Sequence, residues 1–281
     1  MGNALSGKVA FVTGAAAKRG MGHAVALRLA REGADVVVSD KFEAPKSAWT
    51  GDEDWKGLEE VVWEIETLGR KAMASVAGVE KAGEVEAAVK AAIDRFGKID
   101  ILVNCAGTRG PVGIPVVEGN EADWRIQFEV NALGPFIVSR AVAREMIRRK
   151  QGGKIVHIAS AAGKLPVPGS AAYAASKWAV IGFVQALAME LAPYKINVNA
   201  INPGFFATNL RDEDAVMRSR EAGMSVEEFR EDEYKKLISL VPLKRMGKVE
   251  DIANVVFFLV SDQSDYMTGQ AINITGGHLM H

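Results

Sequence analysis

The sequence predicts a single α/β domain built around a parallel sheet whose two faces are both covered by helices. Short runs rich in valine and isoleucine alternate with longer segments whose apolar residues recur at helical spacing. A glycine cluster joins the first run to the first helical segment, and parallel sheets of this kind bind ligands at the carboxyl ends of their strands. The chain has 281 residues, and no Pro/Ser-rich or charged linker divides it.

The elements follow one another in a regular order. Strands are expected at residues 8–13, 35–39, 71–76, 99–103, 154–159, 196–201 and 271–274. Helices are expected at residues 21–32, 58–68, 82–96, 121–149, 171–191 and 249–260, with Asn120 and Asp123 as an N-terminal capping pair for the long fourth helix. Because the strands are continuous apolar runs, we expect helices on both faces of the sheet.

Composition excludes several classes of function. A net charge of -1 gives no electrostatic basis for binding nucleic acid or an acidic membrane, and no apolar stretch approaches the ~20 residues of a membrane span. One cysteine, Cys105, and four scattered histidines form neither a disulfide nor a metal-ligand cluster. Residues 1–8 lack the pattern of a signal peptide. We therefore expect a cytoplasmic protein that needs no metal.

The glycine cluster predicts a dinucleotide site. Gly14 ends the first strand, and Gly20-Met21-Gly22 precedes the first helix, so the backbone can approach a pyrophosphate at the helix N-terminus. A tight turn is the alternative interpretation. Asp40 follows Gly22 by eighteen residues, near the ~20-residue offset at which an acid binds the ribose 2′-hydroxyl of NAD. Arg19 could instead meet the 2′-phosphate of NADP, but the strand end fixes Asp40, which favours NAD over NADP.

The pair Tyr173 and Lys177 predicts acid–base chemistry. On a helix, side chains four residues apart lie on one face, and a nearby ammonium lowers the pKa of a phenol from its ordinary value near ~10. Taken alone, this motif is more often a surface pair. Ser160 lies thirteen residues before Tyr173 at the end of an apolar run, and this supports a catalytic interpretation.

The motifs in this order and spacing resemble the short-chain dehydrogenase/reductase family over nearly the whole chain. They are Thr13-Gly14 with Gly20-Met21-Gly22, Asn104-Cys105-Ala106-Gly107, Asn131, Ser160, Tyr173-x-x-x-Lys177 and Pro203-Gly204 with Thr208. The resemblance implies one Rossmann-type, doubly wound domain over residues 1–281, with about seven parallel strands. It also implies a homo-oligomer, a dimer or a tetramer.

The resemblance further implies the roles of individual residues. Tyr173 would exchange a proton with the substrate oxygen, Ser160 would hydrogen-bond that oxygen, and Lys177 would also bind the nicotinamide ribose. Asn131 would hold a water that links Lys177 to solvent, although local sequence alone favours a solvent-facing amide. The remaining cofactor contacts would come from Asn104, Ala106 and Gly107 near the adenosine ribose and from Pro203, Gly204 and Thr208 near the nicotinamide.

Two features depart from the family pattern on the cofactor side. The glycine loop has two extra residues, so its individual phosphate contacts are not predicted. Gly78-Val79 stands where relatives place an Asp before a Val, so the adenine contact is either absent or made by backbone. Residues 42–56, which include Trp49 and Trp55, form a long segment after Asp40. We interpret it as a decorated surface loop in preference to a cover for the adenosine.

Residues 205–240 correspond to the family's substrate lid and are longer than a small member needs. Phe205 and Phe206 at its root, with Leu165 after the catalytic serine, predict an apolar pocket and a hydrophobic or cyclic secondary alcohol. Arg109 is the alternative, because it could meet an anionic group. Ser225 and Glu228 predict a capping box within the lid.

The helix at 171–191 is apolar nearly all round, so it must be buried, either within the domain or at a subunit interface. The sequence as a whole predicts an NAD-dependent oxidoreductase that interconverts a small-molecule alcohol and its ketone, in a homo-oligomer. An NADPH-dependent 3-oxoacyl-type keto reductase is the alternative within the same class. A non-catalytic dinucleotide-binding sensor is the alternative from a different class.

Overall fold

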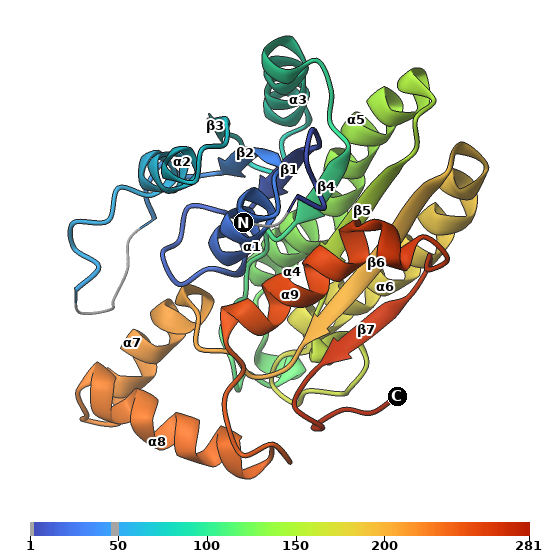
Figure 1. Cartoon of the computed structure of the whole chain (residues 1–281). Helices are drawn as coiled ribbons and strands as arrows, with labels where there is room; N and C mark the ends of the chain where they lie inside the picture. The colour runs from blue at the N-terminus through green and yellow to red at the C-terminus, as the bar shows by residue number, and fades with distance from the viewer. Residues whose placement is uncertain (1–2, 46–50) are drawn as a thin grey trace.

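Seven parallel strands form one sheet in the computed structural model, which describes residues 3–45 and 51–281. Their order across the sheet is β3-β2-β1-β4-β5-β6-β7 (Figure 1). The strands are β1 (Val9–Thr13), β2 (Asp35–Asp40), β3 (Ala72–Val76), β4 (Ile101–Asn104), β5 (Gly153–Ile158), β6 (Ile196–Pro203) and β7 (Ala271–Ile274). Each predicted strand is present, with ends that differ by at most two residues.

Helices cover both faces of this sheet, as the apolar strands predict. They are α1 (Met21–Arg31), α2 (Leu58–Thr67), α3 (Ala82–Phe96), α4 (Glu121–Phe128), α5 (Gly134–Arg149), α6 (Ala171–Leu191), α7 (Asp212–Glu221), α8 (Val226–Ser239) and α9 (Val249–Val260). One buried apolar cluster joins α1, α2 and α9 to the sheet, and a second joins α3, α5 and α6 to the opposite face. Figure 1 shows α9 in front of the strands and α5 and α6 behind them.

The strand order reverses between β1 and β4. The chain moves outward from β1 to β2 and β3, then returns to place β4 on the other side of β1. Thr13 and Asn104, the last residues of β1 and β4, are in register at this point. Ligands of open parallel sheets bind in the crevice outside such a switch point, so the topology itself selects this edge.

The long helix expected at 121–149 is interrupted. The structure has α4, then a π-helical turn at Glu129–Leu133, then α5, with Asn131 in the middle of the turn. Pro135 at the start of α5 has no backbone N–H to donate, which contributes to the break in the hydrogen-bond ladder. π-Helical turns inside helices occur frequently at functional sites. The predicted cap is present, because the side chain of Asn120 accepts a hydrogen bond from the Ala122 amide over 2.8 Å.

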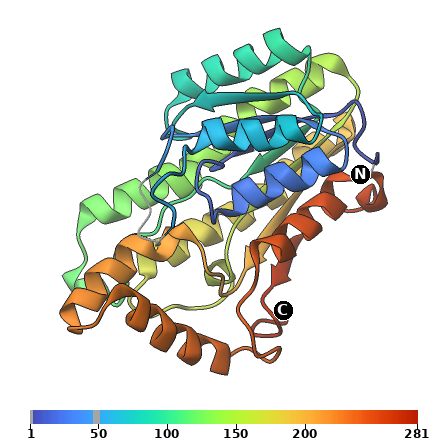
Figure 2. The ribbon, with the colours of Figure 1, turned by 60° about the vertical axis from the view of Figure 1, so that its left-hand side comes forward.

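Residues 205–240 form a helical pair, α7 and α8, outside the three layers (Figures 1 and 2). The predicted capping box is present: the Ser225 hydroxyl accepts from the Glu228 amide, and the Glu228 carboxylate accepts from the Ser225 amide. This pair follows β6 directly, so it stands at the carboxyl end of the sheet. The carboxyl edge of the sheet, where the strand order predicts ligand binding, therefore also carries α7 and α8.

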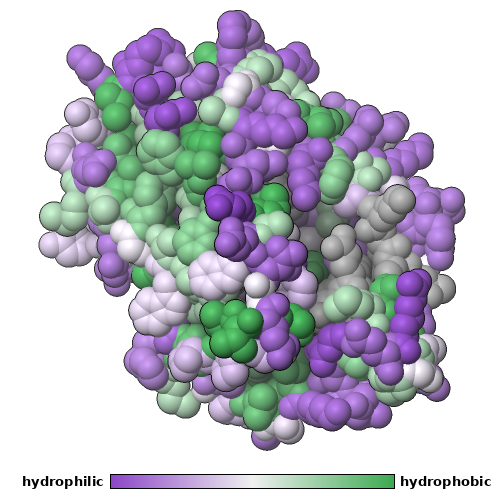
Figure 3. Space-filling view, turned by 180° about the vertical axis from the view of Figure 1, so that it is seen from behind, coloured by the Kyte–Doolittle hydropathy of each residue, from purple (hydrophilic) through white to green (hydrophobic). Residues whose placement is uncertain are grey.

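α6 is buried on one face only. Val180, Val184 and Ala188 pack in the core, whereas Trp178 and Met189 are exposed. On the adjacent α5 and the turn before it, Phe136 and Leu133 are exposed as well. Figure 3 shows the molecule from behind, with hydrophobic side chains gathered on the half where α5 and α6 lie. The chain itself thus leaves the outer side of an apolar helix uncovered.

Candidate active site

A cleft of about 580 Å³ lies at the carboxyl ends of the strands and extends from the glycine loop to the root of residues 205–240. Most of the sequence-predicted site residues line it. These are Gly14, Gly20, Met21, Gly22, Asp40, Val79, Ala106, Gly107, Ser160, Leu165, Tyr173, Lys177, Pro203, Gly204, Phe205, Phe206 and Thr208. They come from seven separate loops or helix starts, which the parallel sheet brings to one edge.

Tyr173 and Lys177 lie one helical turn apart near the start of α6, on the face that the helix turns to the cleft. The Lys177 ammonium is 5.7 Å from the centroid of the Tyr173 ring and donates to the Ile158 carbonyl over 3.1 Å. Burial lowers the pKa of Lys177, and the neighbouring Tyr173 opposes this shift. The start of α6 thus places a buried ammonium and a phenol side by side on the wall of the cleft.

Ser160 follows β5 in an extended conformation and faces the same cleft as Tyr173. Its hydroxyl oxygen accepts a hydrogen bond from the Ala162 amide over 3.1 Å, which leaves its O–H available to donate. The turn at Ala161–Gly163 that carries this amide packs against α6: a Cβ on Gly163 would lie only 2.8 Å from the Lys177 carbonyl oxygen. The serine is therefore held at a fixed distance from the Tyr173 helix.

Asn131 is buried, with 1% of its surface exposed, and is not the solvent-facing amide that local sequence favours. Its Nδ2 donates to the Thr108 carbonyl over 2.9 Å and to the Ser176 hydroxyl over 3.0 Å. Its Oδ1 accepts from the Thr108 amide over 2.8 Å. The π-helical turn thus ties the loop after β4 to the catalytic face of α6.

The glycine loop brings the ends of β1, β4 and α1 into close contact. A Cβ on Gly14, whose φ is +65°, would lie 2.7 Å from the Ala106 amide nitrogen, and a Cβ on Gly22 would lie 2.3 Å from the Gly14 carbonyl oxygen. The Thr13 hydroxyl donates to Asn104 Oδ1 over 2.5 Å and accepts from the Ala106 amide over 3.1 Å. Asn104 therefore pins the sheet at its switch point, while the first amides of α1 open onto the cleft as an anion site.

Asp40 ends β2 and lines the cleft. Its Oδ2 accepts from the Ala16 amide over 3.1 Å, and its Oδ1 accepts from the Phe42 amide over 3.4 Å. Burial raises the pKa of this carboxyl, and these backbone hydrogen bonds oppose the shift. The carboxylate is held by the backbone at the strand end, as the sequence predicts.

Arg19, which could meet the 2′-phosphate of NADP, is not among the residues that line the cleft. Its guanidinium forms an ion pair with the buried carboxylate of Asp52 at 3.1 Å, and its backbone amide donates to Asn209 Oδ1 over 3.0 Å. The described part of the 42–56 segment is mostly exposed, as expected of a surface loop, and Asp52 and Trp55 tie it to the glycine loop. Trp49 lies outside the described residues.

Gly78 does not line the cleft, whereas Val79 and Glu80 do. Its amide donates to Glu84 Oε2 over 2.8 Å. Sequence reasoning missed several other residues of the wall, which come from loops that carry no motif. They are Lys41, Phe42, Thr108, Leu210, Leu240 and His278.

The substrate end of the cleft, beyond Tyr173, is mainly apolar. Leu165, Phe205, Leu210 and Leu240 line it, and the Phe205 ring lies 4.8 Å from the ring of His278. Phe206 is 5% exposed and packs where a Cβ on Gly247 would lie 2.4 Å from its ring, so it supports the wall from within the core. Arg109 also lines the cleft.

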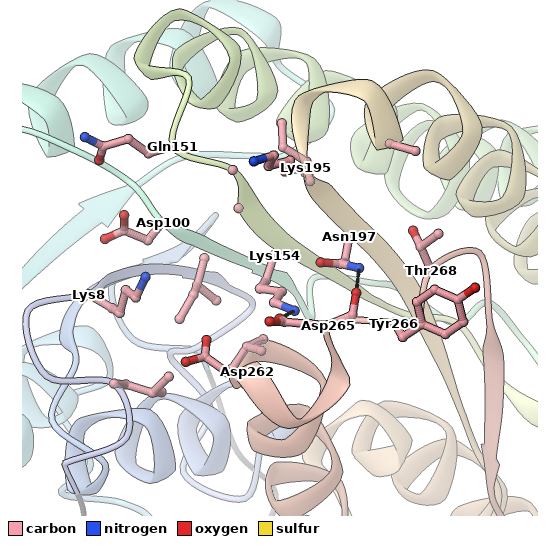
Figure 4. Close-up of a pocket in the computed structure, with 17 residues that line it drawn as sticks. Lys8, Asp100, Gln151, Lys154, Lys195, Asn197, Asp262, Asp265, Tyr266 and Thr268 are labelled. Atoms are coloured by element: carbon pink, nitrogen blue, oxygen red, sulfur yellow. Dashed lines mark hydrogen bonds and ion pairs between the residues drawn. The ribbon is translucent and has the colours of Figure 1, made fainter.

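A second cavity, of about 650 Å³, lies at the opposite edge of the sheet, where β4, β5 and β6 begin (Figure 4). Charged groups of the chain neutralise one another there: Lys154 pairs with Asp265 at 2.6 Å, and Asp100 pairs with Lys98 and Arg149. The helix ends that meet this edge are carboxyl termini, which do not favour anions. It therefore lacks the features that make the first cleft a dinucleotide site.

Within the described residues, no group of three His, Cys, Asp or Glu side chains is arranged to hold a metal ion. No helix of the described chain is both long enough and apolar enough to cross a bilayer.

The sequence model of the short chain dehydrogenase family matches residues 8–218. The chain belongs to the short-chain dehydrogenase family.

Similar proteins of known activity cover the whole chain. The 3-oxoacyl-(acyl-carrier-protein) reductase of Synechocystis sp. is 36% identical over 279 residues, which cover 99% of each chain. The crystal structure of an NAD⁺-bound xylitol dehydrogenase is 34% identical, with a TM-score of 0.83 over 97% of this chain and 99% of that one. Carveol dehydrogenase from Mycobacterium avium in complex with NAD is 29% identical, with a TM-score of 0.88 over 100% of both chains.

These findings make the chain an enzyme, an oxidoreductase of the short-chain dehydrogenase family. Its Rossmann-type fold, with seven parallel strands and helices on both faces, is the predicted one. The relatives give no support to a non-catalytic sensor, because their names describe reductases and dehydrogenases.

Proposed function

We propose that this short-chain dehydrogenase interconverts a hydrophobic or cyclic secondary alcohol and its ketone, with NAD as the cofactor. The observation that carries the proposal is the shared cleft: Asp40 lines its adenosine end, and Tyr173 with Lys177 lines its other end next to an apolar wall. The glycine loop fits a dinucleotide, because Gly14, Gly20 and Gly22 line the cleft where α1 begins and leave its backbone open to a pyrophosphate. A bound nicotinamide supplies the hydride acceptor or donor.

The proton step is assigned to Tyr173. In alcohol oxidation, its phenolate takes the hydroxyl proton of the substrate, and in ketone reduction its phenol returns that proton. The Ser160 O–H donates to the same oxygen, where negative charge develops. Lys177 stabilises the phenolate from its buried position, and Asn131 fixes the wall opposite Lys177 through Thr108. A water held near Asn131 would connect this ammonium to solvent.

Binding of the cofactor is assigned to three groups of residues. The carboxylate of Asp40 would accept a hydrogen bond from the adenosine ribose, and the amides of Met21 and Gly22 at the start of α1 would hold the pyrophosphate, with Gly20 beside them in the cleft lining. Pro203, Gly204 and Thr208 follow β6 and border the nicotinamide end, with Ala106 and Gly107 beneath. Val79 forms the adenine wall in place of the family's Asp-Val pair.

α7 and α8 are proposed to form the substrate lid. Leu210 precedes α7 and Leu240 follows α8, and both side chains line the cleft. A helical pair hinged at these points would exclude water from the reacting oxygen, which strengthens the hydrogen bonds of Ser160 and Tyr173. The apolar wall favours hydrophobic substrates over small charged hydroxy acids.

The alternative is NADPH-dependent reduction of a 3-oxoacyl group. It is favoured by the 36% identity to the Synechocystis reductase over the full chain. Asp40 argues against it, because a carboxylate repels a 2′-phosphate. A cytoplasmic location and assembly into a dimer or tetramer are proposed on the grounds given by the sequence and by the uncovered face of α6.

Two measurements test the proposal. Thermal unfolding with NADH and with NADPH at matched concentrations should show selective stabilisation by NADH, about 2.7 kcal/mol at one hundred times the dissociation constant. Preferential stabilisation by NADPH would instead support the 3-oxoacyl alternative. Tyr173→Phe should reduce alcohol oxidation by about 10²- to 10⁴-fold and leave the NADH-induced stabilisation intact. Full turnover in this variant would exclude Tyr173 as the acid–base group.

A further inference from the structure

Both cations of the glycine loop turn to a single buried carboxylate. The Asp52 side chain is 0% exposed, and its Oδ1 lies 3.2 Å from Lys18 Nζ and 3.1 Å from Arg19 Nη2. The cations themselves keep 39% and 38% of their side-chain surface exposed. Two partly hydrated cations thus converge on an anion that the fold has removed from solvent.

The segment that carries Asp52 is itself fastened to the glycine loop. Lys18 Nζ donates to the Gly51 carbonyl over 3.0 Å, and the Trp55 indole N–H donates to the Ala16 carbonyl over 2.7 Å. The Trp55 ring lies 5.1 Å from the ring of His23 on α1. These contacts hold the segment around Asp52 against the glycine loop. The Asp52 carboxylate is therefore kept within reach of Lys18 and Arg19.

Ala16 connects this arrangement to the adenosine end of the cleft. Its amide donates to Asp40, and its carbonyl accepts from Trp55. Asp40 and Trp55, the latter three residues after Asp52, are therefore bound to the same residue of the glycine loop. Ala17, Gly20 and Asp40 are among the residues that line the cleft, whereas the described side chains of Lys18 and Arg19 are not.

We propose that Asp52 is a specificity-determining residue that disfavours NADP by holding Lys18 and Arg19 away from the adenosine ribose. A 2′-phosphate at that ribose would then face the Asp40 carboxylate without the guanidinium that would otherwise balance it. Lys41, the residue after Asp40, also lines the cleft, and its ammonium lies 4.8 Å from the centroid of the Phe42 ring. This inference rests on the proposed NAD site.

Asp52→Asn tests the inference by binding alone, without turnover. Isothermal titration calorimetry would compare 5′-AMP with adenosine 2′,5′-bisphosphate, which differ only by the 2′-phosphate. We expect the affinity ratio to move toward the bisphosphate by about tenfold in the variant. Because Lys18 and Arg19 already contact water, their release leaves no buried unpaired charge, and the variant should fold.

Asp54→Asn is the matched control, since it removes the same charge from an exposed position two residues away. It should leave the ratio unchanged; an equal shift in this control, or no shift in a folded Asp52→Asn variant, would overturn the inference. A second variant, Arg19→Gln, covers a failure of Asp52→Asn to fold, because Lys18 still pairs with the buried Asp52 carboxylate. It should leave bisphosphate binding unaltered, and a large loss would mean that Arg19 already serves the phosphate.

The outcomes also separate this inference from the proposed function. If neither nucleotide binds the wild-type chain, the dinucleotide site and this inference both fail. If both nucleotides bind the wild-type chain but Asp52→Asn leaves their affinity ratio unchanged, the dinucleotide site is supported and the proposed role of Asp52 is refuted.

Discussion

Asn131 and Lys177 converge on the same point of the backbone at Gly107. A Cβ atom on this glycine would lie 3.3 Å from Asn131 Oδ1 and 3.3 Å from Lys177 Nζ. Gly107 therefore lies next to both Asn131 and Lys177. Because it has no side chain, the loop after β4 can approach the π-helical turn and α6 at the same time.

Gly107→Ala should reduce turnover more than stability. The added methyl group must displace the Asn131 amide or the Lys177 ammonium by a few tenths of an ångström, and misplaced catalytic groups can cost up to about a hundredfold in rate. Steady-state kinetics would measure kcat. Gly83→Ala in α3 is the control, because a Cβ there meets nothing within 4 Å. Equal kcat values for the two variants would contradict the prediction.

His157 should make the protein less stable as the pH falls below neutrality. It is fully buried on β5, with its Nε2 2.9 Å from the Ser139 hydroxyl, and burial lowers its pKa from 6.5 to about 3. Below pH 6.5 the unfolded chain binds a proton that the folded chain does not, so the free energy of unfolding falls by about 1.4 kcal/mol per pH unit from this group.

The measurement is urea unfolding of the wild-type chain and of His157→Gln between pH 7.5 and 5. The carboxyl groups titrate in both proteins and cancel in the comparison. The difference in stability between the two proteins should shrink as the pH falls. Parallel curves would show that His157 titrates alike in the folded and unfolded chains.

Trp178→Glu should dissociate the proposed oligomer. Trp178 is 53% exposed on the uncovered face of α6. Light scattering at micromolar concentration should give a dimer or tetramer for the wild type and a smaller species for the variant. Trp63→Glu on α2 is the control, with 59% exposure outside this face. A monomeric wild type would refute the oligomer directly.

Leu240→Ala should raise KM for bulky apolar alcohols. Leu240 lines the substrate end of the cleft after α8, and one missing apolar group in a pocket typically costs about 1–3 kcal/mol of substrate binding. Leu243→Ala removes a similarly exposed leucine that does not line the cleft. The expected result is a higher KM in the first variant alone. An unchanged KM for both cyclic and linear substrates would show that Leu240 does not contact the substrate.

Patterns close together in the chain predicted most of the candidate site. Tyr173 and Lys177 are separated by one helical turn, and Asp40 ends an apolar run, so helix and strand geometry already place these side chains. Gly14 and Gly22 were predictable for the same reason, since a strand–turn–helix junction requires close backbone approach. The apolar surplus of α6 predicted a buried helix, and the structure shows that the single chain buries only one of its faces.

The sequence by itself determined the parallel sheet, the catalytic face of α6 and the acid at the end of β2, because these depend on periodicity and local spacing. Only the tertiary structure decided three other features. They are the π-helical turn that contains the buried Asn131, the ion pair of Arg19 with Asp52, and the part of the cleft wall formed by Leu210, Leu240 and His278. Those features arise from contacts between distant segments, such as Asp52 with Arg19. Their energies depend on packing and burial, which no short stretch of sequence contains.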